Sequence, residues 1–266
     1  GLNYISTKIG DAGGYALFEN IVDIPPGIET NYFYWNITFV NPEGAVYKNT
    51  SSYNQTISSI IFAICNSSHN VSALNFTVKH EINETGLNAS FKATFYYWQG
   101  EGVVKKNYTY QDVSVTNSSF DFCIFPVDSI FNIDADIEYE RNNYGSRTYY
   151  LRNAVISNVT NLIDLYLLGS ELYVKFFITV KEGVNPFQNA IVTISKYFVG
   201  EGVYKAIGTR ISDEYGEFVE YLDLDKSYKF SIVKDGTSYG TIEKQATCTE
   251  APCELILQIT EAIIDV

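Results

Sequence analysis

Residues 87–98 read LNASFKATFYYW, and this stretch decides the fold class. Apolar side chains occupy every second position from Leu87 to Tyr97, so on an extended chain they would share one face. Alternation over this length is typical of a half-buried β-strand. The same period recurs in residues 31–40, 131–140 and 172–180, and no long amphipathic helix pattern stands out. The sequence therefore predicts an all-β protein of two tandem antiparallel β-sandwiches, immunoglobulin-like in style.

The same stretch contains one of eleven acceptor triplets for N-linked glycosylation, Asn-x-Ser/Thr, which all lie between residues 36 and 160. With 22 Asn and 41 Ser plus Thr in 266 residues, chance alone would give about three such triplets. A glycan is bulky and hydrophilic, so its attachment sites mark the surface of an exported protein. The predicted sites are Asn36, Asn49, Asn54, Asn66, Asn70, Asn75, Asn83, Asn88, Asn107, Asn117 and Asn158.

The triplets and the strand pattern support each other. Within a triplet the Asn and the hydroxyl residue are two positions apart, so on a strand they share one face and the middle residue points to the other. For four triplets we therefore expect an outward sugar and a core side chain in the middle; these middle residues are Ile37, Phe76, Tyr108 and Val159. Other triplets, such as those at Asn49 and Asn117, are expected in loops.

Composition excludes several classes of partner. The formal net charge is −13, whereas nucleic acid and anionic membranes both require a basic face. No run of eighteen or more apolar residues is present, so no membrane span is predicted in this segment. Because residue 1 is Gly and Met is absent, we interpret Gly1 as a processed end from which an export signal was removed. The expected location is the extracellular cell surface.

The acceptor triplets divide the chain into two predicted domains. We place the boundary near residues 169–170, with a heavily glycosylated β-sandwich at 1–169 and a second sandwich, without triplets, at 170–266. A short sequence occurs in similar form in both halves, as GEGVVK at 100–105 and GEGVYK at 200–205, and each copy is expected at a hairpin tip. Two turns that arose independently are the favoured interpretation of this similarity, and a duplication is the alternative.

Four Cys occur in two local groups, and four Cys allow three pairings. We favour Cys65 with Cys123 and Cys248 with Cys253, because each pair then stays within one predicted domain. A tetrahedral metal site is the disfavoured alternative, since the chain has only two His and no C-x-x-C pair. Disulfides fit the oxidising compartment that the triplets also indicate.

The rear part carries a family resemblance. It contains Asn185-Pro186, the alternating Ala190, Val192 and Ile194, then Thr209, the turn SDEYGEF at 212–218, and Tyr228, Phe230 and Gly236. This pattern resembles the carboxypeptidase regulatory-like domain, a small transthyretin-like β-sandwich. The resemblance implies that fold and an accessory or adhesive role without catalytic residues. The whole chain is similar in composition and style to archaeal surface filament glycoproteins, although no diagnostic motif supports that likeness.

Few residues are candidates for catalysis or metal binding. A carboxylate stripe at alternate positions could bind calcium or serve a glycosidase, but a solvated strand face is the favoured interpretation; the stripe is Asp134, Asp136, Glu138 and Glu140. His69 lies among acceptor triplets and His80 in a polar segment, so neither is expected to be catalytic. We predict no catalytic residue, metal site or cofactor, and no enzymatic activity.

The sequence thus predicts a structural subunit of an extracellular filament or sheath, a homopolymer that assembles through surfaces without glycans. Residues 2–9 and 261–266 are short strand-like tails that could add a strand to a neighbouring subunit. Outward aromatic residues also indicate contact with another domain or subunit; these are Tyr96, Trp98, Tyr173 and Phe177. The alternative function is a surface adhesin or viral spike that binds a carbohydrate or protein receptor.

Overall fold

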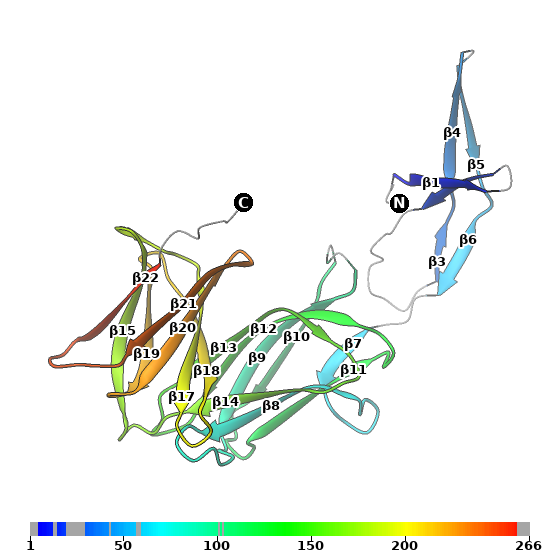
Figure 1. Ribbon diagram of the computed structural model, residues 1–266. Helices are drawn as coiled ribbons and strands as arrows, with labels where there is room; N and C mark the ends of the chain where they lie inside the picture. The colour runs from blue at the N-terminus through cyan, green and yellow to red at the C-terminus, as the bar shows by residue number, and fades with distance from the viewer. Residues whose placement is uncertain are drawn as a thin grey trace.

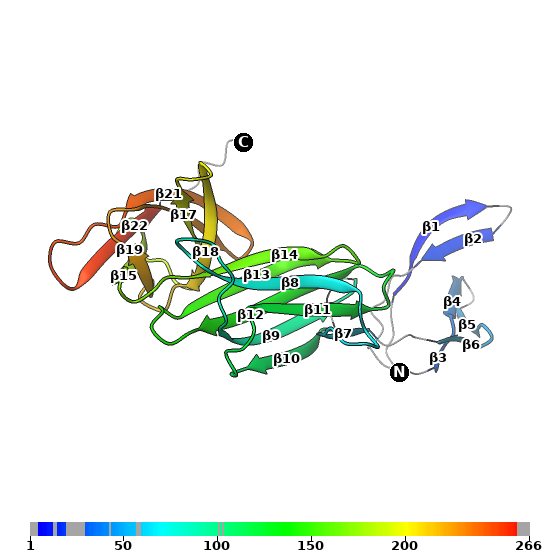
Figure 2. The ribbon, with the colours of Figure 1, turned by 90° about the horizontal axis from the view of Figure 1, so that it is seen from below.

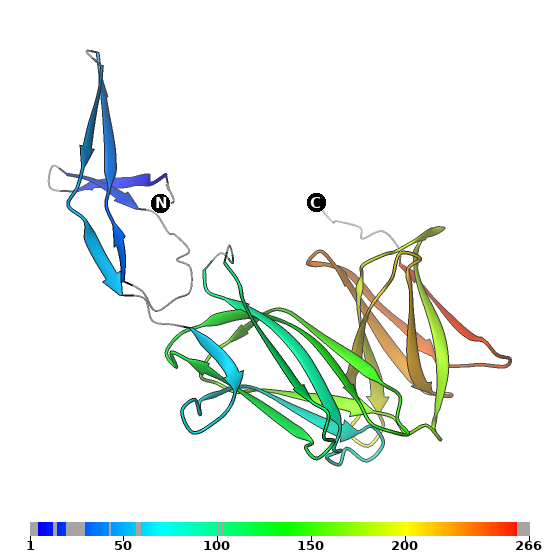
Figure 3. The ribbon, with the colours of Figure 1, turned by 180° about the vertical axis from the view of Figure 1, so that it is seen from behind.

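The computed structural model describes residues 5–12, 15–19, 30–42, 44–56, 60–100, 102 and 104–259. All regular secondary structure within these ranges is β-strand, which confirms the all-β prediction (Figure 1). We call residues 5–56 the N-terminal arm, residues 60–168 the front sandwich and residues 173–259 the rear sandwich. The front sandwich lies between the other two parts, as opposite views show (Figures 1 and 3), and the view from below shows the same order (Figure 2).

The front sandwich consists of two four-stranded sheets, with strand orders β14-β8-β11-β7 and β10-β9-β12-β13. All neighbouring strands are antiparallel except β14 and β8, which are parallel. The strands are β7 (Ile61–Ile64), β8 (Ser72–His80), β9 (Ser90–Trp98), β10 (Lys106–Asp112), β11 (Ser119–Phe125), β12 (Phe131–Glu140), β13 (Arg147–Ile156) and β14 (Asn161–Leu167).

The core of the front sandwich is rich in aromatic rings, and it follows from the alternation in residues 87–98. All six apolar positions from Leu87 to Tyr97 are buried, while Asn88 and Lys92 are exposed. The Phe95 and Phe122 rings, from opposite sheets, have centroids 4.7 Å apart. Such tilted aromatic pairs add to the free energy gained by burying the rings.

The rear sandwich pairs a sheet of order β18-β17-β20-β21 with a sheet in which β15 lies between β22 and β19. Its core is aliphatic and aromatic, and it includes Tyr166 from β14 of the front sandwich. The strands are β15 (Tyr173–Glu182), β16 (Asn185–Pro186), β17 (Ile191–Phe198), β18 (Val203–Ile211), β19 (Glu217–Asp223), β20 (Ser227–Lys234), β21 (Thr237–Gln245) and β22 (Cys253–Ile259).

The two sandwiches have the same strand connections. The orders β10-β9-β12-β13 and β18-β17-β20-β21 correspond strand for strand, and each sandwich pairs its last strand in parallel with β8 or β15. The front sandwich adds β7 at the edge of β11. The echoed sequences follow equivalent strands, β9 and β17; the first lies in the hairpin connection to β10, and the second runs from the hairpin connection into the start of β18. This equivalence favours the duplication over two independent turns, contrary to the preference from sequence.

The N-terminal arm contains β1 (Thr7–Ala12), β2 (Tyr15–Glu19), β3 (Thr30–Phe33), β4 (Asn36–Asn41), β5 (Gly44–Asn49) and β6 (Tyr53–Thr56), paired as three two-stranded sheets. The single strand expected over residues 31–40 is wrong, because the chain leaves the strand conformation at Tyr34 and Trp35. Its aromatic residues do not form a buried face either: Phe33 is 46% and Trp35 37% exposed. Two-stranded sheets have no second layer to cover them, so they bury little apolar surface.

Both predicted disulfides are present, Cys65–Cys123 and Cys248–Cys253. The first joins the start of the β7–β8 connection to β11, and the second closes the turn before β22. The domain boundary near residues 169–170 stays a prediction, but two separate buried clusters lie on its two sides, with Tyr166 the member that crosses it. The described part of the chain has no helix long and apolar enough to span a membrane.

Candidate functional surface and the junction between the sandwiches

All eleven acceptor asparagines lie at the surface of the described chain. Ten are exposed and one, Asn75 on β8, is half-buried. The Asn75 carboxamide donates to the Ser119 hydroxyl at 3.1 Å and accepts from Thr77, the hydroxyl residue of its own triplet, at 3.1 Å. Attachment of glycans stays a prediction, and its steric requirement, an accessible side chain, is met at the ten exposed positions.

The expectation for the middle residues holds for two triplets. Phe76 is fully buried and Tyr108 packs against the front core. Val159 is 70% exposed, so the prediction for it is wrong: the Asn158 triplet lies in the turn between β13 and β14, where the strand alternation does not apply. Ile37 belongs to the arm and to neither core, so its prediction is also wrong. Asn117 lies in a loop as expected, whereas Asn49 ends β5.

Acceptor asparagines also lie at the edges of the front sandwich. Asn107 is on the edge strand β10, Asn66 and Asn70 follow the edge strand β7, and Asn158 precedes the edge strand β14. An unprotected edge strand invites pairing with another chain, and a bulky group on it prevents that pairing. The rear edge strands β21 and β22 carry no triplet, so the predicted glycans would leave these two edges open to strand addition.

The predicted outward aromatic residues have different surroundings. Phe177 on β15 and Tyr96 on β9 are each 40% exposed, as expected. Tyr173 packs on Tyr221 of β19, with ring centroids 4.5 Å apart. Trp98 is buried, contrary to expectation, because the Lys105 ammonium lies 3.7 Å from its ring centroid and the β9–β10 connection covers it.

The carboxylate stripe on β12 is paired with cations. Asp134 contacts Lys105 at 3.1 Å, Asp136 contacts Arg152 at 2.6 Å, and Glu138 contacts Lys92 at 3.1 Å. Glu140 is exposed at the end of the stripe. Among the described residues no cluster of three His, Cys, Asp or Glu is arranged to hold a metal ion. The arrangement fits a solvated strand face with cross-strand ion pairs.

Both histidines have structural contacts. The His69 backbone N–H donates to the Asn66 carboxamide oxygen at 2.9 Å, and its ring lies 6.0 Å from that of Phe125. His80 accepts the Ile82 N–H at Nδ1, 3.1 Å away, within a tight turn. These contacts give each imidazole a role in shaping a loop, and the expectation that neither is catalytic stays a prediction.

A buried ionic cluster, which the sequence did not indicate, joins the two sandwiches. The Arg147 side chain at the start of β13 is fully buried and contacts Glu81 at 2.5 Å and Glu220 of the rear sandwich at 3.2 Å. The cluster contains three cationic and three carboxylate side chains, which are Arg147, Lys196, Arg210, Glu81, Glu220 and Asp223. Buried charges persist in proteins when they are paired and hydrogen-bonded, as all six are.

Arg147 also satisfies backbone carbonyls on both sides of the junction. Its guanidinium donates to the carbonyl oxygens of Tyr166 at 2.9 Å and Tyr221 at 3.0 Å. The Tyr139 hydroxyl donates to the Ile207 carbonyl at 3.1 Å, and the Thr148 hydroxyl donates to the Thr209 carbonyl at 2.5 Å. These bonds link the front sandwich to β18 and β19 of the rear sandwich.

The cluster shifts the protonation of its members. Burial acts to raise the pKa of the Glu81 carboxyl, but Arg147 and Lys196 outweigh burial, so this pKa lies below its ordinary value. Burial acts to lower the pKa of Arg147, whereas Glu81 and Glu220 raise it above its ordinary value. Burial raises the pKa of Tyr139, which keeps its hydroxyl protonated as a donor. The charged forms of Glu81 and Arg147 are therefore favoured at neutral pH.

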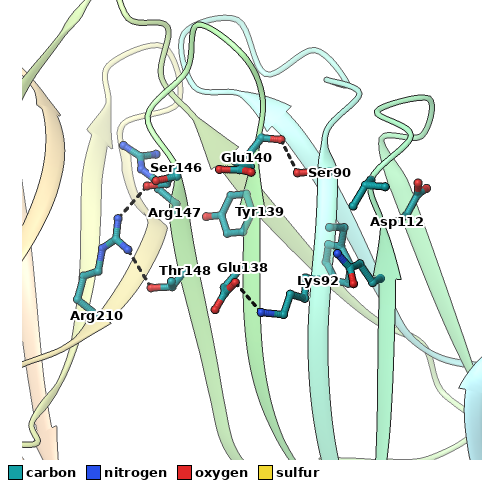
Figure 4. Close-up of a pocket in the computed structure, with 13 residues that line it drawn as sticks. Ser90, Lys92, Asp112, Glu138, Tyr139, Glu140, Ser146, Arg147, Thr148 and Arg210 are labelled. Atoms are coloured by element: carbon teal, nitrogen blue, oxygen red, sulfur yellow. Dashed lines mark hydrogen bonds and ion pairs between the residues drawn. The ribbon is translucent and has the colours of Figure 1, made fainter.

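A shallow depression of about 280 Å³ lies on the solvent side of this junction (Figure 4). Its floor is the outer face of β9, β12 and β13, and its walls come from the end of β10 and from Arg210 of the rear sandwich. Arg210 donates to the Thr148 hydroxyl at 3.2 Å and to the Ser146 carbonyl at 2.9 Å. Lys92 and Glu138 face each other across the floor (Figure 4).

Comparisons with known proteins do not assign a family. No protein-family profile and no curated protein matches the chain. Among solved structures, a streptococcal ancillary pilin is 12% identical with a TM-score of 0.27, over 71% of this chain and 62% of the pilin. The shaft pilin SpaA from Lactobacillus rhamnosus GG is 11% identical with a TM-score of 0.27, over 71% of this chain and 97% of the pilin.

The Bacillus anthracis TIE protein is 15% identical with a TM-score of 0.26, over 87% of this chain and 41% of that protein. TM-scores of this size do not place the chain in the family of any of these proteins. The resemblance of residues 184–236 to carboxypeptidase regulatory-like domains likewise stays a prediction.

Proposed function

We propose that this chain is the structural subunit of an extracellular, heavily glycosylated filament or sheath, of the archaeal type that its composition suggests. One observation carries the proposal: the acceptor asparagines cover the arm and the front sandwich, and the rear sandwich has none. A glycan buried in a protein interface would lose its hydration, so glycans and subunit contacts exclude each other. The rear sandwich is therefore the surface through which copies of the chain associate.

The rear sandwich offers suitable contact surfaces. Phe177 and Ile256 lie on the outer face of β15 and β22, and they are 40% and 48% exposed. The hydrogen bonds and ion pairs between the sandwiches support the same function, because a filament transmits force only through subunits whose domains are firmly connected.

Strand donation by a chain end remains part of the proposal. Thr7 and Lys8 are already paired with β2 in a hairpin, so this end would dock as a hairpin or release β1 first. Residues 1–4 and 261–266 lie outside the described ranges. Truncation of either end tests the idea: a truncated chain that folds but does not polymerise supports donation, and two truncated chains that both polymerise contradict it.

A surface adhesin is the second candidate, and the arm is the observation that favours it. Tyr32, Tyr34, Tyr47 and Tyr53 of the arm are each more than half exposed. Aromatic side chains that project at one end of the molecule suit recognition of a sugar or protein. Electron microscopy of native material distinguishes the two candidates, since polymers indicate the filament and discrete particles indicate the adhesin.

New acceptor triplets test the proposed interface. Phe177→Asn creates the triplet Asn-Ile-Thr on the outer face of β15, with the buried Ile178 in the middle. Lys229→Asn creates Asn-Phe-Ser on the outer face of the other rear sheet, with the buried Phe230 in the middle. Both copy the natural triplet at Asn107 on β10, where an exposed Asn precedes a residue that packs against the core. We expect glycosylated variants that fold as the parent does, with at least one of them unable to polymerise.

The matched controls are Phe177→Asn/Thr179→Ala and Lys229→Asn/Ser231→Ala, which carry the new Asn without a triplet. Because they receive no sugar, they are expected to polymerise. Polymers formed by both glycosylated variants would contradict an interface on the rear sandwich. Peptide mass mapping of the same samples checks the glycosylation itself, and unmodified natural sites would contradict the glycoprotein part of the proposal.

A further inference from the structure

We infer that the depression between the sandwiches is a cradle for the chain's own glycan at Asn88, so that this sugar bridges the front and rear sandwiches. The inference rests on the proposed glycosylation and goes beyond it, because it assigns one glycan a fixed seat on the protein. It is argued from the direction of one triplet, from the charges of the lining, and from the position of the depression.

The triplet at Asn88 points toward the depression. Leu87, Ala89 and Phe91 are buried, so Asn88, Ser90 and Lys92 form the outward row of an extended segment. Ser90 and Lys92 both line the depression. Residues two apart on a strand are about 7 Å apart, so a sugar on Asn88 begins one such step from Ser90.

The neighbouring acceptor Asn117 lies beside the wall that the end of β10 forms, where its carboxamide donates to the Asp112 carboxylate at 2.9 Å. The Ala89 N–H donates to the Asn117 carbonyl at 3.0 Å, so the two acceptor sites lie side by side. However, the hydroxyl of the Asn117 triplet is Ser119, which accepts from Asn75 on the outer face of the other front sheet. Of the two triplets, only the one at Asn88 has its hydroxyl residue, Ser90, in the lining of the depression.

The lining suits a neutral ligand rich in hydroxyl groups. It contains three cationic side chains, Lys92, Arg147 and Arg210, and three carboxylates, Asp112, Glu138 and Glu140, so its formal charge is balanced. The rest of the lining consists of serine and threonine hydroxyls, the Gln111 amide and the side chains of Phe91, Val113 and Tyr139. Within the described chain, the Glu140 carboxylate and the Gln111 amide have no hydrogen-bond partner. Each can bond to a sugar hydroxyl, which donates and accepts equally well.

Because the depression lies at the junction, a sugar seated in it would contact both sandwiches. One wall is Arg210 of the rear sandwich, and the floor contains Thr148 and Arg147 at the start of β13 (Figure 4). A sugar seated there covers the solvent side of the ionic cluster and holds parts of both sandwiches. It therefore slows the local opening that lets water reach the backbone of β13 and β18.

Hydrogen exchange on the secreted, complete chain tests the inference, with glycopeptide mapping to establish occupancy. The test variant is Asn88→Gln and the matched control is the adjacent Asn117→Gln. We expect Asn88→Gln to raise amide exchange in peptides covering β13 and β18 by roughly threefold to tenfold, and Asn117→Gln to leave these peptides unchanged. Equal effects of the two variants, or none from Asn88→Gln, would overturn the cradle.

A second variant keeps the sugar and removes its contacts. Glu140→Ala/Gln111→Ala is expected to stay glycosylated at Asn88 and to show the same faster exchange at β18. This variant also decides the matter if Asn88→Gln does not fold. An empty Asn88 among occupied neighbours overturns the cradle alone and leaves the filament proposal intact. A chain without any glycan overturns both.

Discussion

Replacement of Arg147 by Met should uncouple the two sandwiches and destabilise the chain more than any surface substitution. The side chain is fully buried, and Met matches much of its length without its charge. The change leaves Glu81 and Glu220 with one cation fewer, and it removes a donor from the carbonyls of Tyr166 and Tyr221. Removal of one partner from a buried ion pair costs about 3–5 kcal/mol of unfolding free energy. For a chain of this size that corresponds to a fall in Tm of about 6–20 °C.

Thermal unfolding followed by circular dichroism measures this effect, with Arg152→Met as the matched control. Arg152 makes the same kind of ion pair, to Asp136 at 2.6 Å, but the two side chains are 35% and 47% exposed. Exposed pairs contribute about 1 kcal/mol or less, so the control should melt within about 4 °C of the parent. Restoring charge balance with Arg147→Met/Glu81→Gln should recover part of the loss. An Arg147→Met variant no less stable than the control would refute the importance of the cluster.

Two further predictions concern acid and disulfides. The folded chain holds the pKa of Glu81 below its ordinary value of 4.5, so the stabilisation by the Glu81 carboxylate is complete above about pH 4.5 and is lost as the pH falls further. The Tm of the Glu81→Gln variant should therefore approach the Tm of the parent in acid. A difference in Tm that stays constant with pH would contradict this prediction. The Cys65–Cys123 bond joins residues 58 positions apart, and the Cys248–Cys253 bond joins residues 5 positions apart. Replacement of the first pair by Ala should lower the free energy of unfolding by about 4 kcal/mol, and replacement of the second pair by about 2 kcal/mol. Urea unfolding measures both losses, and a larger loss for the second pair would contradict the loop-entropy argument.

Local patterns predicted much of the fold. The alternation in residues 87–98 identified a two-layer β-structure because the period of a strand is a property of the chain itself. The disulfide pairs followed from their proximity within each half, and the exposure of the acceptor triplets followed from the size of a glycan. Where the pattern was weak the predictions failed. Val159 lies in a turn, and Trp98 is covered by the hairpin connection that follows it, which no alternation rule takes into account.

The sequence by itself determined the fold class, the local cross-links and the unequal distribution of possible glycans along the chain. Only the tertiary structure decided how the two sandwiches are joined. Glu81, Arg147 and Glu220 lie far apart in the chain and belong to strands whose neighbours look ordinary, so no local period marks them. Their charges become significant when folding removes them from water, because pairing then replaces the lost hydration. The same folding brings Arg210 opposite Ser90 and so creates the depression beside Asn88.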